Sequence, residues 1–248
     1  MREADQPDPP APFVQNITAS GHSTVAAGAI HGDVIFHPSA GSARFRSVGG
    51  RDRRIRILLL AANPQPTTRL ALGDEAREIT EKLRLSRDRD DFELITRWAV
   101  RPADLLQAIN EHRPHIVHFS AHGRQSGEIL LAAADGGEQP VTPAALAQVF
   151  GSTPEEIRVV LLNACYSTAQ AQAIGLHVDF IIGMDAPIDD RAATVFAAAF
   201  YSALGFGRSV RVAFNQGVAA LMLHGMPGHE VPQLFVRPGA DADEAIMV

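Results

Sequence analysis

The sequence predicts an α/β protein in which a mostly parallel sheet carries helices on both faces. Two observations lead to this fold class. Continuous apolar runs such as IRILLLAA at 55–62 and RVVLLNACYS at 158–167 are typical of parallel strands that are covered on both sides. Segments with helical spacing separate these runs, and a strand-helix-strand order requires crossover connections and hence parallel pairing.

The elements follow in a regular order. Residues 72–87 place apolar side chains at helical spacing, with Asp74 and Glu75 in the first turn, where the helix dipole favours acids. A Gly-containing stretch, 127–141, predicts a hairpin. The expected strands are 55–62, 92–100, 115–123, 158–167 and 178–187, and the expected helices are 72–87, 101–113, 142–151, 167–175 and 189–205.

Composition shifts divide the chain into unequal parts. Residues 1–12 are acidic and Pro-rich and are expected to be disordered. Residues 13–37 contain short β-prone runs separated by glycine, and 38–54 form a Ser/Gly/Arg linker. The main domain is expected over 55–240, followed by a flexible end at 241–248. Two interpretations of 13–37 stay open: a small β appendage, or an adaptor-like segment that pairs with strands of another chain.

Charge and cysteine content narrow the classes of partner. The net charge is −6 and the pI about 5.9, so the totals imply no basic face for nucleic acid. No apolar run approaches the length that spans a bilayer, so no membrane partner is expected. The single cysteine cannot form an intramolecular disulfide, which favours a reducing cytoplasm.

Two expected strands end in reactive side chains. One runs into His122 and Gly123, and the other into Cys165. Because the carboxyl ends of neighbouring parallel strands meet at one edge of a sheet, the imidazole and the thiol can face one another there. Such a pair can perform acyl transfer, with the histidine as base and the thiolate as nucleophile. The N–H groups of Gly123 and Cys165 would form the oxyanion hole.

Other polar residues in the chain are interpreted more simply. His118 lies about 13 Å along the strand from His122, too far for one metal ion, so we expect no metal site and a hydrogen-bonded core role for His118. The loop after the first strand lacks the glycines of a phosphate-binding turn, so no nucleotide cofactor is expected. We therefore predict a protein without cofactors.

Three motifs in this order resemble the CHAT branch of the caspase, separase and gingipain clan. They are SAHG at 120–123, LNACYS at 162–167, and the segment from FIIGM at 180 through FYSALGFGRSVRVAF at 200–214. The resemblance covers residues 55–236. It implies a caspase-like three-layer fold and a cysteine endopeptidase with His122 and Cys165 as catalytic pair. It further implies a bacterial defence or cell-death system in which another component activates the enzyme.

Substrate preference and partners complete the expectations. Asp185 and Asp189 follow the strand after the cysteine, where an S1 wall should lie, and a carboxylate there would favour Arg or Lys at P1. Alternatively, Asp189 simply caps the next helix. The expected partners are a protein substrate and an activator or adaptor that contacts 13–37, with homo-oligomerisation on activation. The competing hypothesis is a non-catalytic scaffold that binds a regulator.

Overall fold

The structure is a computed structural model that describes residues 54–153 and 156–248. The expectations for 1–12 and 13–37, and for the linker up to residue 53, lie outside the described residues.

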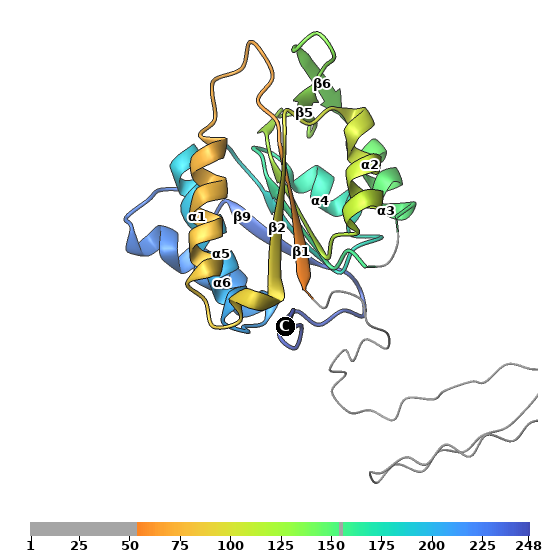
Figure 1. Ribbon diagram of the computed structural model, residues 1–248. Helices are drawn as coiled ribbons and strands as arrows, with labels where there is room; N and C mark the ends of the chain where they lie inside the picture. Colours follow the sequence, from red (N-terminus) through yellow and green to blue (C-terminus); the bar gives the residue numbers. More distant parts are fainter. Residues whose placement is uncertain (1–53, 154–155) are drawn as a thin grey trace, which may run out of the picture. The chain divides into compact units, whose positions relative to one another are not determined.

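A six-stranded sheet forms the centre of the described chain (Figure 1). Its strand order is β2-β1-β3-β7-β8-β9, and all neighbours are parallel except the edge pair β8 and β9. The strands are β1 (Ile55–Ala61), β2 (Phe92–Trp98), β3 (Ile116–Ser120), β7 (Val159–Asn163), β8 (Phe180–Met184) and β9 (Pro232–Val236). The predicted parallel α/β arrangement is confirmed.

Helices cover both faces of this sheet, which confirms the three-layer arrangement (Figure 1). Along β1, Leu59 belongs to a core with α1, α5 and α6, whereas Leu58 and Leu60 belong to a second core with α2, α3 and α4. This alternation follows from the two-residue period of a strand. The helices are α1 (Leu72–Arg84), α2 (Pro102–His112), α3 (Pro143–Gly151), α4 (Thr168–Ile174), α5 (Asp190–Gly205) and α6 (Val210–Leu223), with a 3-10 turn at Arg89–Asp91.

The third strand differs from its expected extent. Instead of continuing through 123, β3 ends at Ser120, and the chain leaves the main sheet at Ala121. His122–Gly123 form the short strand β4 in a separate antiparallel sheet with β5 (Ile129–Ala132) and β6 (Glu138–Val141). The predicted hairpin is therefore confirmed, but it carries a third strand that contains the histidine.

Two elements at the C-terminal end were not predicted as such. Helix α6 follows α5, and its Gly217 allows close packing, since an added Cβ would lie 2.7 Å from the ring of Phe196. Strand β9 closes the sheet against β8. It is short, begins with a proline and is only partly buried, so it lacks the apolar run that marks the central strands.

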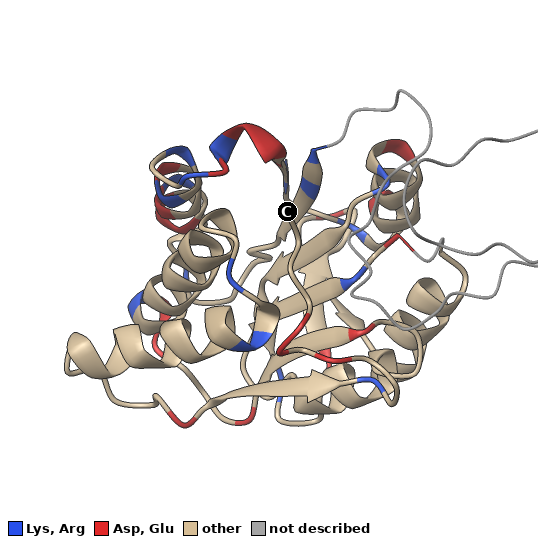
Figure 2. Cartoon of the chain, turned by 90° about the horizontal axis from the view of Figure 1, so that it is seen from below, with Lys and Arg blue, Asp and Glu red and all other residues tan. Residues whose placement is uncertain are grey.

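Charged residues lie mainly on the helices and in the connecting loops, and Figure 2 shows acidic and basic residues interspersed along them. Among the described residues, no helix is both long and apolar enough to cross a bilayer.

Candidate active site

The register between β3 and β7 places His122 and Cys165 just beyond the paired ends of these two neighbouring strands. Ser120 pairs with Asn163, the last residues of the two strands, and the N–H of Ala121 donates to the carbonyl of Asn163 at 3.3 Å. His122 and Cys165 each follow two residues beyond this last pair. The neighbouring strands required by the sequence analysis are therefore observed, although Cys165 lies in the turn after β7 rather than within the strand.

The backbone of Gly123 lies directly against the backbone of Cys165. A Cβ added to Gly123 would lie 1.8 Å from the carbonyl oxygen of Cys165 and 3.1 Å from its nitrogen. No side chain fits in this space, so the position requires glycine. The histidine strand and the cysteine turn are thus in van der Waals contact through their main chains.

The strand pairing of β4 also fixes where the N–H of Gly123 points. His122 pairs with Leu130 and Gly123 with Ile129, and the next pair is joined by a 2.9 Å bond from the N–H of Arg124 to Glu128. Hydrogen-bonded and non-hydrogen-bonded pairs alternate in an antiparallel ladder. The pair that contains Gly123 is therefore of the non-hydrogen-bonded kind, and its N–H points away from β5.

The imidazole of His122 is oriented by a main-chain carbonyl. Its Nε2 lies 2.7 Å from the carbonyl oxygen of Thr68, in the loop between β1 and α1. A carbonyl oxygen can only accept, so Nε2 carries the proton and donates it. In the neutral ring, Nδ1 then keeps its lone pair and is the nitrogen that can act as a base. The side chain is half-buried, as is Cys165.

A sharp turn presents Cys165. Tyr166 adopts a left-handed backbone conformation with φ of 56°, which costs a non-glycine residue about 1 to 3 kcal/mol. The buried Ser167 holds the turn from below, because its hydroxyl donates to the carbonyl of Leu162 at 3.1 Å and accepts from the N–H of Met184 at 2.9 Å. The turn is thus tied to both β7 and β8.

A buried polar cluster lies directly beneath these strand ends. The carboxylate of Glu75 accepts hydrogen bonds from Ser120 and Asn163, and its Oε1 lies 3.3 Å from Nε2 of His118. The other ring nitrogen of His118 lies 3.3 Å from the hydroxyl of Tyr201, on α5. The predicted core role of His118 is confirmed. Glu75 was attributed only to the helix dipole, although it stands on the same helix face as the buried Ala76 and Ile79.

The surroundings of Glu75 keep its carboxyl group ionised. Burial alone would raise the pKa of Glu75, but the positive charge of His118 and hydrogen bonds from His118, Ser120 and Asn163 bring that pKa below its ordinary value of 4.5. Burial, and then the charge of Glu75, raise the pKa of Tyr201 well above its ordinary value. At neutral pH the cluster therefore contains a carboxylate and a phenol.

The two acids predicted for substrate binding occupy different environments. Asp189 is the N-cap of α5, and its carboxylate accepts from the N–H groups of Arg191 and Ala192 at 3.0 and 3.3 Å. The structure therefore contains the helix cap that the sequence analysis left open as the alternative role of Asp189. Asp185 is exposed at the carboxyl end of β8, the strand beside β7.

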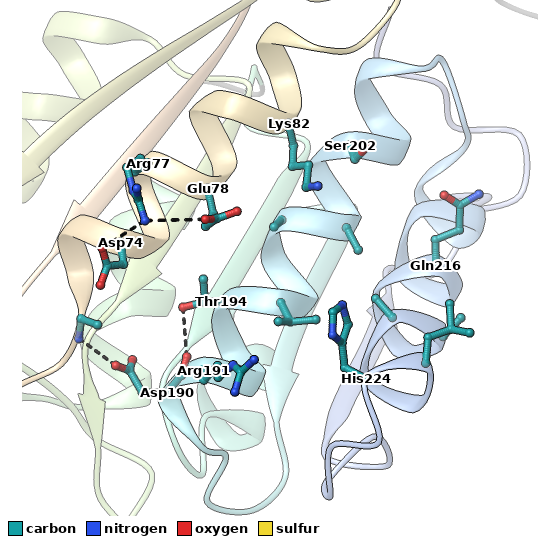
Figure 3. Close-up of a pocket in the computed structure, with 17 residues that line it drawn as sticks. Asp74, Arg77, Glu78, Lys82, Asp190, Arg191, Thr194, Ser202, Gln216 and His224 are labelled. Atoms are coloured by element: carbon teal, nitrogen blue, oxygen red, sulfur yellow. Dashed lines mark hydrogen bonds and ion pairs between the residues drawn. The ribbon is translucent and has the colours of Figure 1, made fainter.

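A groove of about 960 Å³ lies elsewhere, between α1 and α6 over α5 (Figure 3). Small residues such as Ala198, Ala199 and Ala219 line it together with the outer face of α1, and neither His122 nor Cys165 does. Sequence reasoning did not identify this groove. No group of three or more His, Cys, Asp or Glu side chains that could hold a metal ion occurs in the described part of the chain.

Comparison with known proteins connects this geometry to a family. The family model described as CHAT domain matches residues 33–225, beginning upstream of the domain start expected at 55. Among curated proteins, a Roc-COR-CHAT protease of an unknown prokaryotic organism is 26% identical over 198 residues, which are 74% of this chain and 19% of that protein. A probable protease of Gillisia limnaea (strain DSM 15749 / LMG 21470 / R-8282) is 21% identical over 169 residues, which are 66% of this chain and 30% of that protein. The chain thus spans less than a third of either relative.

Solved structures show the same fold at low identity. The Arg-specific cysteine proteinase gingipain R superposes with a TM-score of 0.56 and 14% identity, covering 81% of this chain and 50% of that one. Caspase-1 from Spodoptera frugiperda gives a TM-score of 0.53 and 12% identity, covering 80% and 95%. The fold is therefore caspase-like. Since the family model matches well over half of the sequence, this chain belongs to the CHAT domain family.

Proposed function

We propose that this chain is a cysteine endopeptidase with Cys165 as nucleophile and His122 as base. The observation that carries the proposal is the main-chain contact between Gly123 and Cys165, because it joins the histidine and cysteine segments at one point beyond the strand ends. Two curated relatives named as proteases support the same activity. A scaffold without chemistry needs neither the thiol nor the oriented imidazole.

We propose a proton path that starts from the orientation of His122. His122 is held at Nε2 by Thr68, so Nδ1 accepts the proton of the Cys165 thiol, and the thiolate adds to the substrate carbonyl carbon. The resulting oxyanion receives hydrogen bonds from the N–H groups of Gly123 and Cys165. Nδ1 then returns its proton to the leaving amine as the C–N bond breaks, which leaves a thioester. Water, deprotonated by His122, hydrolyses the thioester and regenerates the thiol.

For the substrate, we propose a protein cleaved after Arg or Lys, with Asp185 as the recognition residue. Asp185 is exposed at the carboxyl end of β8, next to the strand that leads to Cys165. A carboxylate binds a guanidinium through charge-assisted, bidentate hydrogen bonds. Asp189 is the second candidate, but its carboxylate already caps α5. The structurally similar gingipain R is named as Arg-specific, which points the same way.

For its biological setting, we propose a cytoplasmic effector of bacterial defence or cell death that another component activates. A peptidase that is always active would damage the cell that makes it. Both curated relatives extend far beyond the matched region, so in them this domain is joined to long additional sequences. In the present chain, residues 13–37 are the proposed contact for an activator or for a second copy.

The first prediction concerns the dyad. Cys165→Ala and His122→Ala should each abolish cleavage of fluorogenic peptides while leaving the thermal unfolding midpoint nearly unchanged, because both side chains are only half-buried and lie beyond the strand ends. Peptide turnover and circular dichroism of the same preparations measure both effects. Retained turnover in either variant would show that another residue is the nucleophile or base.

The second prediction tests the main-chain contact between Gly123 and Cys165. Gly123→Ala places a methyl group against the carbonyl of Cys165, and main chain cannot swing aside as a side chain can. We expect turnover to fall by about a hundredfold or more, the loss caused by removing one oxyanion donor. The matched control is Gly73→Ala, an exposed helical position with no atom within 4 Å of the added Cβ. It should keep full activity and gain about 0.5 to 1 kcal/mol of stability.

The third prediction tests specificity. In a panel of peptides that differ only at P1, those with Arg or Lys should be cleaved best, and Asp185→Asn should lower kcat/KM for Arg by about tenfold or more. Asp189→Asn is the matched control, since asparagine caps a helix as well as aspartate does but carries no charge. A preference for Asp at P1, or an equal loss in the two variants, would contradict the role of Asp185.

The fourth prediction addresses activation. The full-length monomer should cleave peptides slowly, and about 3 kcal/mol of differential activator binding suffices to raise the active population more than a hundredfold. Deleting residues 1–54 should preserve the basal rate but remove the response to the activator. Replacing Val25, Ile30 and Ile35 with Lys should have the same effect, because charge opposes strand pairing. Equal activation of truncated and intact protein would make 13–37 a mere appendage.

A further inference from the structure

Five buried side chains beneath the dyad take no part in the proton path described above. They are Glu75, His118, Ser120, Asn163 and Tyr201, here called the Glu75 cluster, and each is at most 7% exposed. Burying an ionised carboxylate is costly unless it is paired and hydrogen-bonded. A cluster of this kind in an otherwise apolar core calls for a physical explanation beyond packing.

One carboxylate connects the two strands that carry the dyad. Oε2 of Glu75 accepts from the hydroxyl of Ser120, the last residue of β3, and Oε1 accepts from the amide of Asn163, the last residue of β7. Ser120 stands two residues before His122, and Asn163 stands two residues before Cys165. Both hydrogen bonds therefore act at the points from which the chain continues to the reactive side chains.

The helix that bears Glu75 also connects to the orientation of His122. Helix α1 follows the loop whose Thr68 carbonyl holds the imidazole. Just before the first turn, the N–H of Ala71 donates to the carboxylate of Asp190 on α5 at 2.7 Å, a contact drawn in Figure 3. Helix α1, which follows the Thr68 loop, is thus bonded to α5 at its start and, through Glu75, to the ends of both strands.

We propose that Glu75 is a positioning residue, which aligns the ends of β3 and β7 so that His122 and Cys165 meet in reactive geometry. This inference rests on the proposed dyad. Glu75 acts through Ser120 and Asn163 and touches neither reacting atom. The requirement is geometric rather than electrostatic. A glutamine in its place can accept at Oε1 from Asn163 and donate its amide to the hydroxyl of Ser120, which preserves a hydrogen bond to each strand end while removing the charge that faces His118.

The test uses the full 248-residue protein and the reactivity of its single cysteine. A cysteine thiol is mostly protonated at pH 7, so iodoacetamide reacts quickly only where a positioned base assists, and intact mass reports Cys165 alone. We expect Glu75→Ala to lower the alkylation rate at pH 7 by about tenfold, toward the rate of His122→Ala, because a displacement of about 1 Å already costs up to a hundredfold. Glu75→Gln should stay within about twofold of the unaltered protein.

Two further variants separate positioning from stability. Ser120→Ala removes the bond next to His122, whereas Tyr201→Phe removes a bond at the far end of the cluster. The first should slow alkylation and the second should not, even where their unfolding midpoints fall equally. If Glu75→Ala does not fold, the comparison of Ser120→Ala with Tyr201→Phe still tests whether Glu75 positions the strand ends.

The outcomes distinguish the two proposals. Slow alkylation in Glu75→Ala and Ser120→Ala, with a normal rate in Glu75→Gln, supports positioning by Glu75. A normal rate in folded Glu75→Ala, or an equal rate in Ser120→Ala and Tyr201→Phe, overturns it while leaving the dyad intact. If His122→Ala reacts as fast as the unaltered protein, the dyad itself is wrong and the inference falls with it.

Discussion

The pairing of β3 with β7 is the constraint on which the remaining features of the site depend. Parallel register aligns Ser120 with Asn163. His122 and Cys165 each follow two residues beyond this pair. Beyond that pair, the main chain of Gly123 lies directly against the main chain of Cys165. A shift of one residue in this register would turn every side chain of β3 to the opposite face. The register is specified because the two faces of β3 differ: His118 and Ser120 contact Glu75, whereas Val117 and Phe119 pack in the apolar core on the other side.

Both cores contribute to holding that register. One side of the sheet is covered by α1, α5 and α6 and the other by α2, α3 and α4, so the central strands have apolar neighbours on either face. The buried polar residues of the site lie near the ends of β3 and β7. There, Glu75 replaces an apolar side chain on the inner face of α1, and Ser167 ties the cysteine turn to β7 and β8. Ser167 satisfies main-chain groups of Leu162 and Met184, whereas Glu75 satisfies the side chains of Ser120 and Asn163.

Much of this arrangement could be predicted from the sequence, for physical reasons. The apolar runs of β1 and β7 are unambiguous because strands buried on both faces need continuous hydrophobic sequence. His122 and Cys165 follow such runs, and the parallel topology then places them together. The break at Ala121 could not be predicted, since SAHG reads as a continuation of the strand until the contact of Gly123 with Cys165 is known. Strand β9 is half-exposed and short, and it carries no distinctive period.

Other parts of the site have no signature in sequence. The partner of His122 is the carbonyl of Thr68, and a carbonyl belongs to every residue alike. For Asp189, the sequence left open whether its carboxylate lines a substrate pocket or caps the next helix, and the fold shows the cap. For Glu75 the sequence did contain a signal. Its place in the first turn indicates a favourable interaction with the helix dipole, but its place within the apolar stripe of an amphipathic helix also indicates a buried polar partner.

A crystal structure of the full chain with a peptide aldehyde that ends in arginine tests most directly whether the main chain at the two strand ends builds the proposed acyl-transfer site. We expect a bond from Cys165 Sγ to the aldehyde carbon, with the new oxygen about 3 Å from the N–H nitrogens of Gly123 and Cys165. Nε2 of His122 should remain on the carbonyl of Thr68. An adduct whose oxygen points away from Gly123, or no adduct at Cys165, would show that the proposed site is wrong.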